Sequence, residues 1–409
     1  MRRLFNTAIL KNGFVKGSVT LMLGAGLSQA IPVIFSIFLA RLYQPEQFGD
    51  LAIFTALCYI VGMISTGTYE LTVMLPDNDR QAYQLLTGLT FLSGIVSCIL
   101  ALIIFFVKFA GVEMPGYANY LPFGVFFTGL FQGYTYWLNR KKKYIFLSLL
   151  RLIQSIGIVL PSLIIGIFFH YREGLIVGYL IGFGVAVLPL MVFLFKKRNI
   201  TSFGEVVAVL KKYKNYPKVI LPTSLLNTTS SYAPVLAITK FYSKTTVGFY
   251  SMTQRVLTAP VSIISSVIGQ IYYQRIASQK KSIRTTFFTT SGLLTILSVI
   301  IFVPLLMFGQ QIIVLLFGQQ WLSAGIYLTI ICWSTMVKFV VSPLSTILLV
   351  TNNEKKLAFW QTCYFITTIG IFIVGANFNI ITMLWIYTFH EIVMYLFYYV
   401  IMINCINQL

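Results

Sequence analysis

Five charged side chains lie inside stretches of this sequence that are apolar enough to cross a membrane. Three are cations and two are carboxylates: Lys338, Arg255, Arg151, Glu70 and Glu391. A charge at bilayer depth costs about 2.5 kcal/mol or more, so such a residue normally faces protein or water and marks a binding or ion pathway. Lysine and arginine bind phosphate through charge-assisted hydrogen bonds. The excess of cations therefore predicts a wet, slightly positive passage that accepts a negatively charged head group.

The three cations can be ranked as substrate-binding candidates by how deep each lies within its apolar stretch. Lys338 is the strongest, because it lies near the middle of its stretch, too deep to reach water easily. Arg255 lies about a third of the way into its stretch and either lines a cavity or reaches the outer head groups. Arg151 is about two turns from the cytoplasmic end, where reaching the head groups is an equal alternative. The polar run that begins at Asn227 adds this amide as a further substrate-binding candidate.

The two carboxylates, Glu70 and Glu391, each have two interpretations. Each either forms a structural ion pair with one of the cations, or binds a proton or a sodium ion that couples transport to a gradient. The sequence favours neither role. No metal ion, other cofactor or catalytic residue is expected, because the five cysteines and two histidines are scattered without ligand spacing. No G-x-x-x-x-G-K-S/T loop is present, so nucleotide hydrolysis is not expected to drive the process.

The composition is that of a polytopic membrane protein. Of 409 residues, 57% are hydrophobic and 10% are charged, against about 25% charged in soluble domains. The net charge of +20 is spread over alternate loops rather than one face or tail, which argues against a nucleic-acid partner. Apolar runs of about 20 residues predict twelve transmembrane helices, near 16–40, 49–75, 83–107, 118–138, 144–169, 174–195, 219–240, 248–273, 285–308, 323–350, 357–376 and 380–404.

Charge placement in the loops predicts the orientation. Most of the 30 Lys and Arg residues fall on the same side as the N-terminus. Because cytoplasmic loops carry the excess of positive charge, both termini are predicted to be cytoplasmic. The basic N-terminal segment shows no convincing cleavage site and is expected to stay attached. Every loop but the central one is short, which leaves no room for an extramembrane catalytic domain.

The longest interval without a membrane-length apolar run is basic and lies at the centre of the chain. Ser202 and Glu205 form a capping-box pattern, and the apolar residues that follow recur at helical spacing. The pattern predicts an amphipathic helix of about three turns on a membrane surface, ended by Pro217. A plain solvated connector is the alternative. In both cases the chain divides into an N-terminal lobe, a linker and a C-terminal lobe, at 1–198, 199–216 and 217–409.

A weak internal repeat supports this division. The turn from Arg41 to Gly49 and the turn from Lys240 to Gly248 share a cation, a tyrosine and a glycine in register. Six spans per lobe is an even number, so two similar lobes must have the same orientation, related by a pseudo-twofold axis along the membrane normal. Chance similarity between apolar segments is the alternative. The predicted fold is therefore an all-α polytopic membrane protein with two six-helix lobes.

Four short motifs follow one another along the chain, at Tyr43–Gly49, Tyr69–Pro76, Tyr216–Asn227 and Phe317–Trp321. Through their order, the whole chain resembles Wzx-type O-antigen and polysaccharide flippases of the multidrug/oligosaccharidyl-lipid/polysaccharide (MOP) exporter superfamily. The resemblance implies a transporter, not an enzyme, that moves an undecaprenyl-diphosphate-linked oligosaccharide, the O-antigen repeat unit. Transport would run from the inner to the outer leaflet of the bacterial cytoplasmic (inner) membrane by alternating access. Membrane lipids and other polysaccharide-assembly proteins are the further partners implied.

The resemblance reaches the site residues unevenly. Glu70 matches the Tyr-Glu pair of the family, whereas Arg255 and Lys338 match its lobe-facing cations by depth only. Two other functions stay open. An ion-coupled drug or small-molecule exporter of the same superfamily would be expected to have a more conspicuous intramembrane carboxylate and less basic character. A membrane glycosyltransferase or polysaccharide polymerase would need a longer external loop. The sugar composition, the coupling ion and the oligomeric state are also open.

Overall fold

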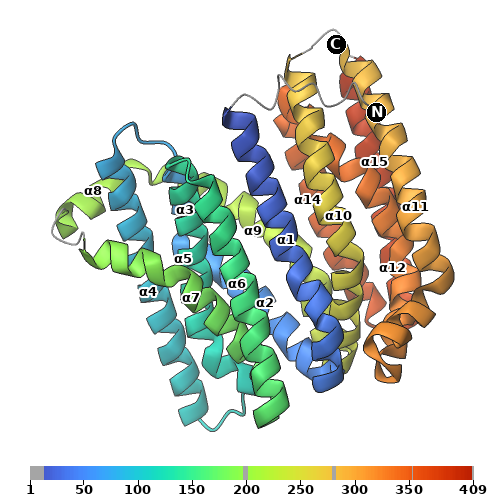
Figure 1. Cartoon of the computed structure of the whole chain (residues 1–409), viewed down its shortest axis with the longest axis horizontal. Helices are drawn as coiled ribbons and strands as arrows, with labels where there is room; N and C mark the ends of the chain where they lie inside the picture. The colour runs from blue at the N-terminus through green and yellow to red at the C-terminus, as the bar shows by residue number, and fades with distance from the viewer. Residues whose placement is uncertain (1–12, 197–200, 279–281, 352, 408–409) are drawn as a thin grey trace. The chain divides into compact units, whose positions relative to one another are not determined.

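The computed structural model describes residues 13–196, 201–278, 282–351 and 353–407, which form helices and loops without a strand (Figure 1). The segment before residue 13 and the predicted boundary at 198–199 lie outside the described residues. Packing divides the chain into two compact units. Unit 1 consists of Met1–Tyr43 and Asp50–Thr228, and unit 2 of Gln44–Gly49 and Thr229–Leu409. The predicted lobe and linker boundaries stay predictions.

Unit 1 is built from long apolar helices around a core of leucine and aromatic side chains, among them Leu86, Leu130, Trp137 and Leu190. Lipid tails are as apolar as leucine, so close packing rather than exclusion from water holds such helices together. The elements are α1 (Gly13–Leu42), α2 (Pro45–Thr66), α3 (Tyr69–Thr72), α4 (Asp79–Phe109), η2 (Gly116–Tyr120), α5 (Leu121–Arg140), α6 (Tyr144–Ile164), η3 (Ile165–Phe169), α7 (Gly174–Lys196), α8 (Phe203–Lys212) and α9 (Asn215–Phe241). Along the chain, α2 and α9 each continue from one unit into the other.

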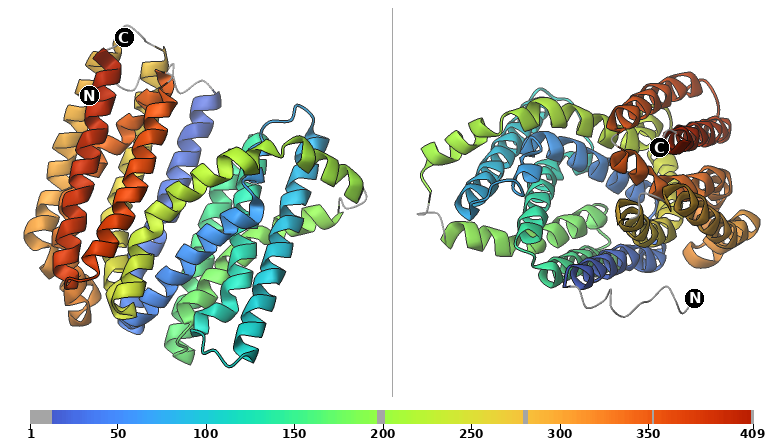
Figure 2. Two further views of the ribbon diagram at one scale, coloured as in Figure 1. Left: turned by 180° about the vertical axis from the view of Figure 1, so that it is seen from behind. Right: turned by 90° about the horizontal axis from the view of Figure 1, so that it is seen from above.

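Unit 2 has a core of large aromatic residues, of which Phe48, Phe302, Phe317 and Trp321 are fully or almost fully buried. The α15 helix packs against both α12 and α14 (Figure 2). This arrangement brings the intramembrane charges of the second half together. The elements are α10 (Lys244–Ser278), α11 (Ile283–Phe317), η6 (Gln319–Trp321), α12 (Leu322–Val341), η7 (Ser342–Thr346), α13 (Ile347–Val350), α14 (Glu354–Gly375) and α15 (Ile380–Asn407).

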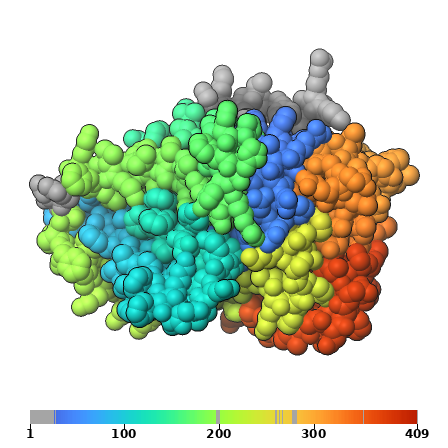
Figure 3. Space-filling view, turned by 90° about the horizontal axis from the view of Figure 1, so that it is seen from below, coloured from blue at the N-terminus to red at the C-terminus, as the bar shows by residue number. Residues whose placement is uncertain are grey.

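The outer surface of these helices is apolar. Large hydrophobic side chains such as Phe109 (82% exposed) and Leu315 (77% exposed) point outward, as expected where lipid replaces water. Phe109 ends α4, and the connection from there to α5 lies at the surface in the space-filling view (Figure 3). Within the described residues, eight helices are long and apolar enough to cross a membrane. The predicted fold class, an all-α polytopic membrane protein, is therefore confirmed, while the number of twelve spans and the pseudo-twofold axis stay predictions.

The predicted amphipathic helix is present as α8, which lies at an angle to the long helices of unit 1 (Figure 1). Its capping box is complete, because the Ser202 hydroxyl accepts from the Glu205 amide and the Glu205 carboxylate accepts from the Ser202 amide, both at 3.4 Å. Val206 and Val209 are buried. The predicted end was wrong: α8 stops at Lys212, and Pro217 lies in the first turn of α9, where proline costs no helical hydrogen bond.

Candidate substrate and ion site

Glu70 does not lie in the second span, which corrects the sequence-based placement. The α2 helix ends at Thr66, because Gly67 (φ 60°) and Thr68 (φ 58°) both adopt the left-handed conformation. Glu70 follows in the short helix α3 and is only 3% exposed. The Thr66 side chain lies beside the carboxylate, while Oε2 has no hydrogen-bond partner among the described residues. Burial raises the pKa of the Glu70 carboxyl.

The buried carboxyl predicts a pH dependence of stability. With a folded-state pKa raised above its ordinary value of 4.5, Glu70 keeps its proton in the folded protein at pH values where the unfolded chain has lost it. The contribution of Glu70 to stability should therefore be fully present at or below about pH 4.5 and be lost as the pH rises through the folded-state pKa. Glu70→Gln should remove that loss. The check is the melting temperature of the detergent-purified protein between about pH 4.5 and pH 8.

A matched control comes from Glu205, an exposed carboxylate whose pKa is lowered by its hydrogen bond to Arg80. Folding lowers the pKa of Glu205 but raises that of Glu70. Glu205→Gln should therefore still lose stability as the pH rises. If Glu70→Gln and the wild type lose stability in parallel as the pH rises, the buried Glu70 carboxyl is not the titrating group.

Lys338 and Glu391 are brought together in unit 2. Lys338 is half-buried in the last turn of α12, just before the chain tightens into the η7 segment that contains Pro343. Its Nζ lies 5.5 Å from the centroid of the Tyr395 ring, a cation–π distance. Glu391 on α15 is 4% exposed and accepts a hydrogen bond from the Tyr364 hydroxyl. The ammonium and the carboxylate interact electrostatically, so each lowers the cost of burying the other.

Aromatic rings enclose this pair. Trp360 on α14 stacks on Tyr398 at 4.1 Å and on Tyr364 at 5.2 Å, and its indole NH donates to the Met394 carbonyl at 2.9 Å. Tyr364 also stacks on His390 at 5.9 Å. The rings offer flat apolar faces, and the hydroxyl and indole groups offer polar edges. An arrangement of this kind can hold a polar, sugar-like group beside a cation within an otherwise apolar layer.

The sequence did not identify this ring cluster. Its signal is the spacing of Trp360 and Tyr364 on α14 and of Glu391 and Tyr395 on α15. Residues four apart share one face of a helix, so each pair points to one side. In a chain with 24 Tyr and 35 Phe, however, such pairs are too common to stand out.

Arg255 lies on α10, five residues after Tyr250, and is half-buried. Its guanidinium carbon lies 5.3 Å from the centroid of the Phe48 ring. Tyr250 interacts electrostatically with Lys338 and accepts a hydrogen bond from the Gln254 amide at 3.0 Å. Arg255 thus packs against an aromatic ring of unit 2. It lies on α10, the same helix as Tyr250, which interacts with Lys338.

Arg151 and Asn227 both belong to unit 1. Arg151 lies on α6, is partly exposed and forms no hydrogen bond or ion pair with another described residue. Asn227 lies on α9 with an exposed side chain. The structure therefore assembles Lys338 and Glu391 into one cluster and places the other four predicted residues elsewhere, so their roles stay predictions.

These features define the class. A charged side chain buried in the membrane is tolerated only where it is paired or has a role in binding or transport. Apolar helices that cross a membrane several times and bury charged and polar groups are therefore typical of transporters. Residues 38–326 match the protein family described as polysaccharide biosynthesis protein. The chain belongs to this family, which confirms the family resemblance found in the sequence.

A sequence relative and two solved structures agree with this assignment. The teichuronic acid biosynthesis protein TuaB of Bacillus subtilis (strain 168) is 19% identical over 191 residues. That match spans 46% of this chain and 40% of the relative, so it covers less than half of either protein. The lipid II flippase MurJ in an inward closed conformation superposes with a TM-score of 0.77 at 13% identity, over 95% of this chain and 89% of that chain. An inward-facing multidrug resistance MATE family transporter of the MOP superfamily gives 0.62 at 14% identity, over 93% and 95%. At these identities the structures show a shared fold.

Proposed function

We propose that this protein is a flippase that moves an undecaprenyl-diphosphate-linked oligosaccharide from the inner to the outer leaflet of the bacterial cytoplasmic membrane. The observation that carries the proposal is the cluster in which Lys338 lies over the Tyr395 ring and Tyr364 donates to Glu391, inside the apolar helices of a chain from a polysaccharide biosynthesis family. A half-buried lysine beside aromatic rings suits a phosphate attached to sugars. Both termini are proposed to be cytoplasmic, and 1–198 and 217–409 to act as lobes that alternate access across the linker 199–216. No residue is assigned a catalytic role.

The Lys338–Glu391 pair provides a simple exchange mechanism. Without substrate, Glu391 balances the charge of Lys338, and the Tyr364 hydroxyl holds Glu391 in place. A phosphate that enters the cluster competes with Glu391 for Lys338. Protonation of Glu391, or binding of a sodium ion to it, removes that competition and ties substrate binding to an ion gradient. The membrane potential adds about 2.3 kcal/mol per 100 mV for each negative charge moved outward.

The direct test is a flipping assay in proteoliposomes that contain the full chain. A fluorescent polyprenyl-diphosphate oligosaccharide is placed in both leaflets, and the fraction accessible to an external quencher is followed over time. Protein-dependent flipping of this lipid, and none of a polyprenol that lacks the diphosphate, is the expected result. Flipping that ignores the diphosphate would contradict the proposal. Export of a cationic dye without any flipping of the glycolipid would favour a drug exporter instead.

A further inference from the structure

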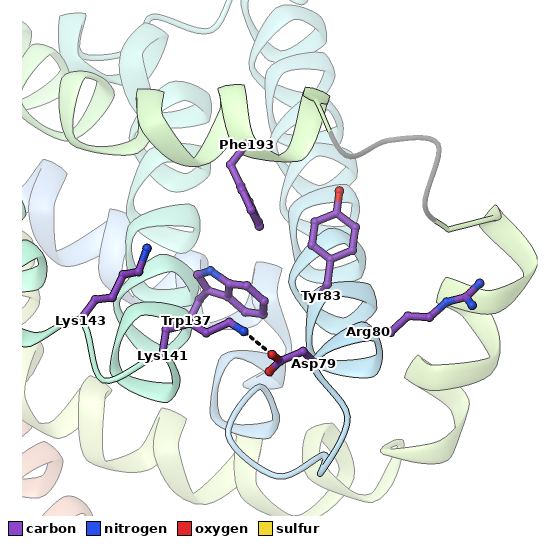
Figure 4. Close-up of a pocket in the computed structure, with 7 residues that line it drawn as sticks. All are labelled: Asp79, Arg80, Tyr83, Trp137, Lys141, Lys143 and Phe193. Carbon is purple, nitrogen blue, oxygen red and sulfur yellow. Dashed lines mark hydrogen bonds and ion pairs between the residues drawn. The ribbon is translucent and has the colours of Figure 1, made fainter.

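A cavity of about 420 Å³ opens in unit 1 where α4 begins and α5 and α7 end (Figure 4). Three rings form its wall, namely Tyr83, Trp137 and Phe193, with centroids 5.6 to 6.5 Å apart. The Tyr83 hydroxyl donates to the Leu194 carbonyl at 3.2 Å, which fixes the ring. Tyr83 and Trp137 are almost completely buried. The wall is therefore preformed, and it has no part in the Lys338 cluster.

One edge of the cavity carries an unbalanced positive charge. The Lys141 ammonium lies 5.1 Å from the centroid of the Trp137 ring and pairs with the Asp79 carboxylate (Figure 4). Arg140 pairs with the same carboxylate at 3.1 Å. Since one carboxylate serves two cations, this group retains a net positive charge. An anion that enters beside Trp137 would meet Lys141 at the ring face.

Lys143 adds a second cation to the lining, from the short loop after α5. It is exposed and forms no ion pair with another described residue. Arg80, by contrast, donates to Glu205 on α8 at 2.7 Å and points away from the three rings (Figure 4). The free positive charge of the cavity therefore comes from the Lys141 and Lys143 side.

The surface next to the cavity is apolar. Phe195 on α7 is 68% exposed, and Ile145 at the start of α6 is 68% exposed. Each lies two residues along the chain from a lining residue, Phe193 and Lys143 respectively. Tyrosine and tryptophan rings beside lysines, at the ends of apolar helices, are typical of the head-group level of a membrane. The site thus combines cations, flat rings and an adjacent apolar surface.

We propose that this cavity binds the head group of an anionic phospholipid. The phosphate lies between Lys141 and Lys143, which bind it as ammonium donors. The glycerol of the head group lies against Trp137 and Phe193, and the acyl chains follow the exposed apolar surface beside Ile145 and Phe195. This proposal is independent of the transported glycan, because every residue that it uses lies outside the Lys338 cluster.

The first test compares neighbouring lysines. Binding of dihexanoyl phosphatidylglycerol to the detergent-purified full chain is measured by microscale thermophoresis for Lys143→Gln and Lys142→Gln. Lys142 is exposed and does not line the cavity, yet its replacement removes the same charge one residue away. Lys143→Gln should weaken binding about fivefold, and Lys142→Gln less than about twofold. Equal losses would show diffuse attraction to a basic loop and overturn the proposal.

A gain of affinity provides the second test. Asp79→Asn removes the carboxylate that competes for Lys141, so the same lipid should bind at least about twofold tighter. A variant with a damaged fold would bind the lipid more weakly, so misfolding cannot explain tighter binding. Unchanged or weaker binding would contradict the proposed site. Dihexanoyl phosphatidylcholine should bind poorly, and glycerol 3-phosphate should bind more weakly than the lipid. Equal affinity for phosphatidylcholine would contradict the proposal that the head group must be anionic. Equal affinity for glycerol 3-phosphate would contradict the proposal that the ligand is a lipid.

Discussion

Replacing Lys338 with alanine is expected to reduce flipping of the polyprenyl-diphosphate oligosaccharide by about a hundredfold. A hydrogen bond to a charged group contributes about 1.5–3 kcal/mol, and every 1.4 kcal/mol is a factor of ten. Lys338 is the cation that the structure places beside the Tyr364 and Tyr395 rings and the Glu391 carboxylate. The proteoliposome assay measures the effect. Lys338→Arg should retain part of the activity, because it keeps the charge but changes the shape of the donor.

The control must separate substrate binding from simple charge balance, because Lys338→Ala also leaves Glu391 buried without its cation. The double variant Lys338→Ala with Glu391→Gln restores a neutral interior. It should insert and remain folded, yet still fail to flip the glycolipid. Recovery of flipping in the double variant would show that Lys338 serves only to neutralise Glu391. Lys355→Ala, which removes an exposed lysine of α14, should flip at the wild-type rate.

The sequence predicted Lys338 as a site residue from its depth within an apolar stretch. A lysine in the middle of a long apolar stretch needs a partner, and the structure supplies Glu391 and Tyr395. The pairing itself was not predictable, because α12 and α15 meet only through tertiary packing. The rings of Trp360 and Tyr364 were missed because aromatic residues are common throughout the chain.

The misplacement of Glu70 has a local cause. The apolar run continues past Thr66, so hydropathy alone extends the span to about residue 75. The helix ends earlier because Gly67 and then Thr68 adopt positive φ. Glycine does so readily, but threonine, with its branched side chain, rarely does, so only the glycine gave any warning. The cavity at Trp137 could not be predicted for a different reason, because it forms from three helix ends that are distant in the sequence.

Substituting alanine for Gly248 is expected to be the most damaging single change in unit 2. A Cβ added at Gly248 would lie 1.8 Å from the Pro45 carbonyl oxygen, and one added at Gly49 would lie 2.1 Å from the Lys244 carbonyl oxygen. The two repeated glycines therefore lie in the first turns of α2 and α10, and these two helical turns cross at the glycines, backbone against backbone. Because the obstacle is main chain rather than a flexible side chain, relief needs a backbone shift, which typically costs about 1–3 kcal/mol.

The measurement is the melting temperature and the size-exclusion profile of the purified variants in detergent. Gly248→Ala should lower the melting temperature by several degrees or abolish the monodisperse peak, and Gly49→Ala should behave in the same way. Gly292 on α11 provides the matched control, since it is exposed and a Cβ there meets nothing within 4 Å. The melting temperature of Gly292→Ala should equal that of the wild type or lie slightly above it, because alanine favours the helical conformation. A Gly248→Ala protein as stable as Gly292→Ala would mean that the two turns do not cross at their glycines.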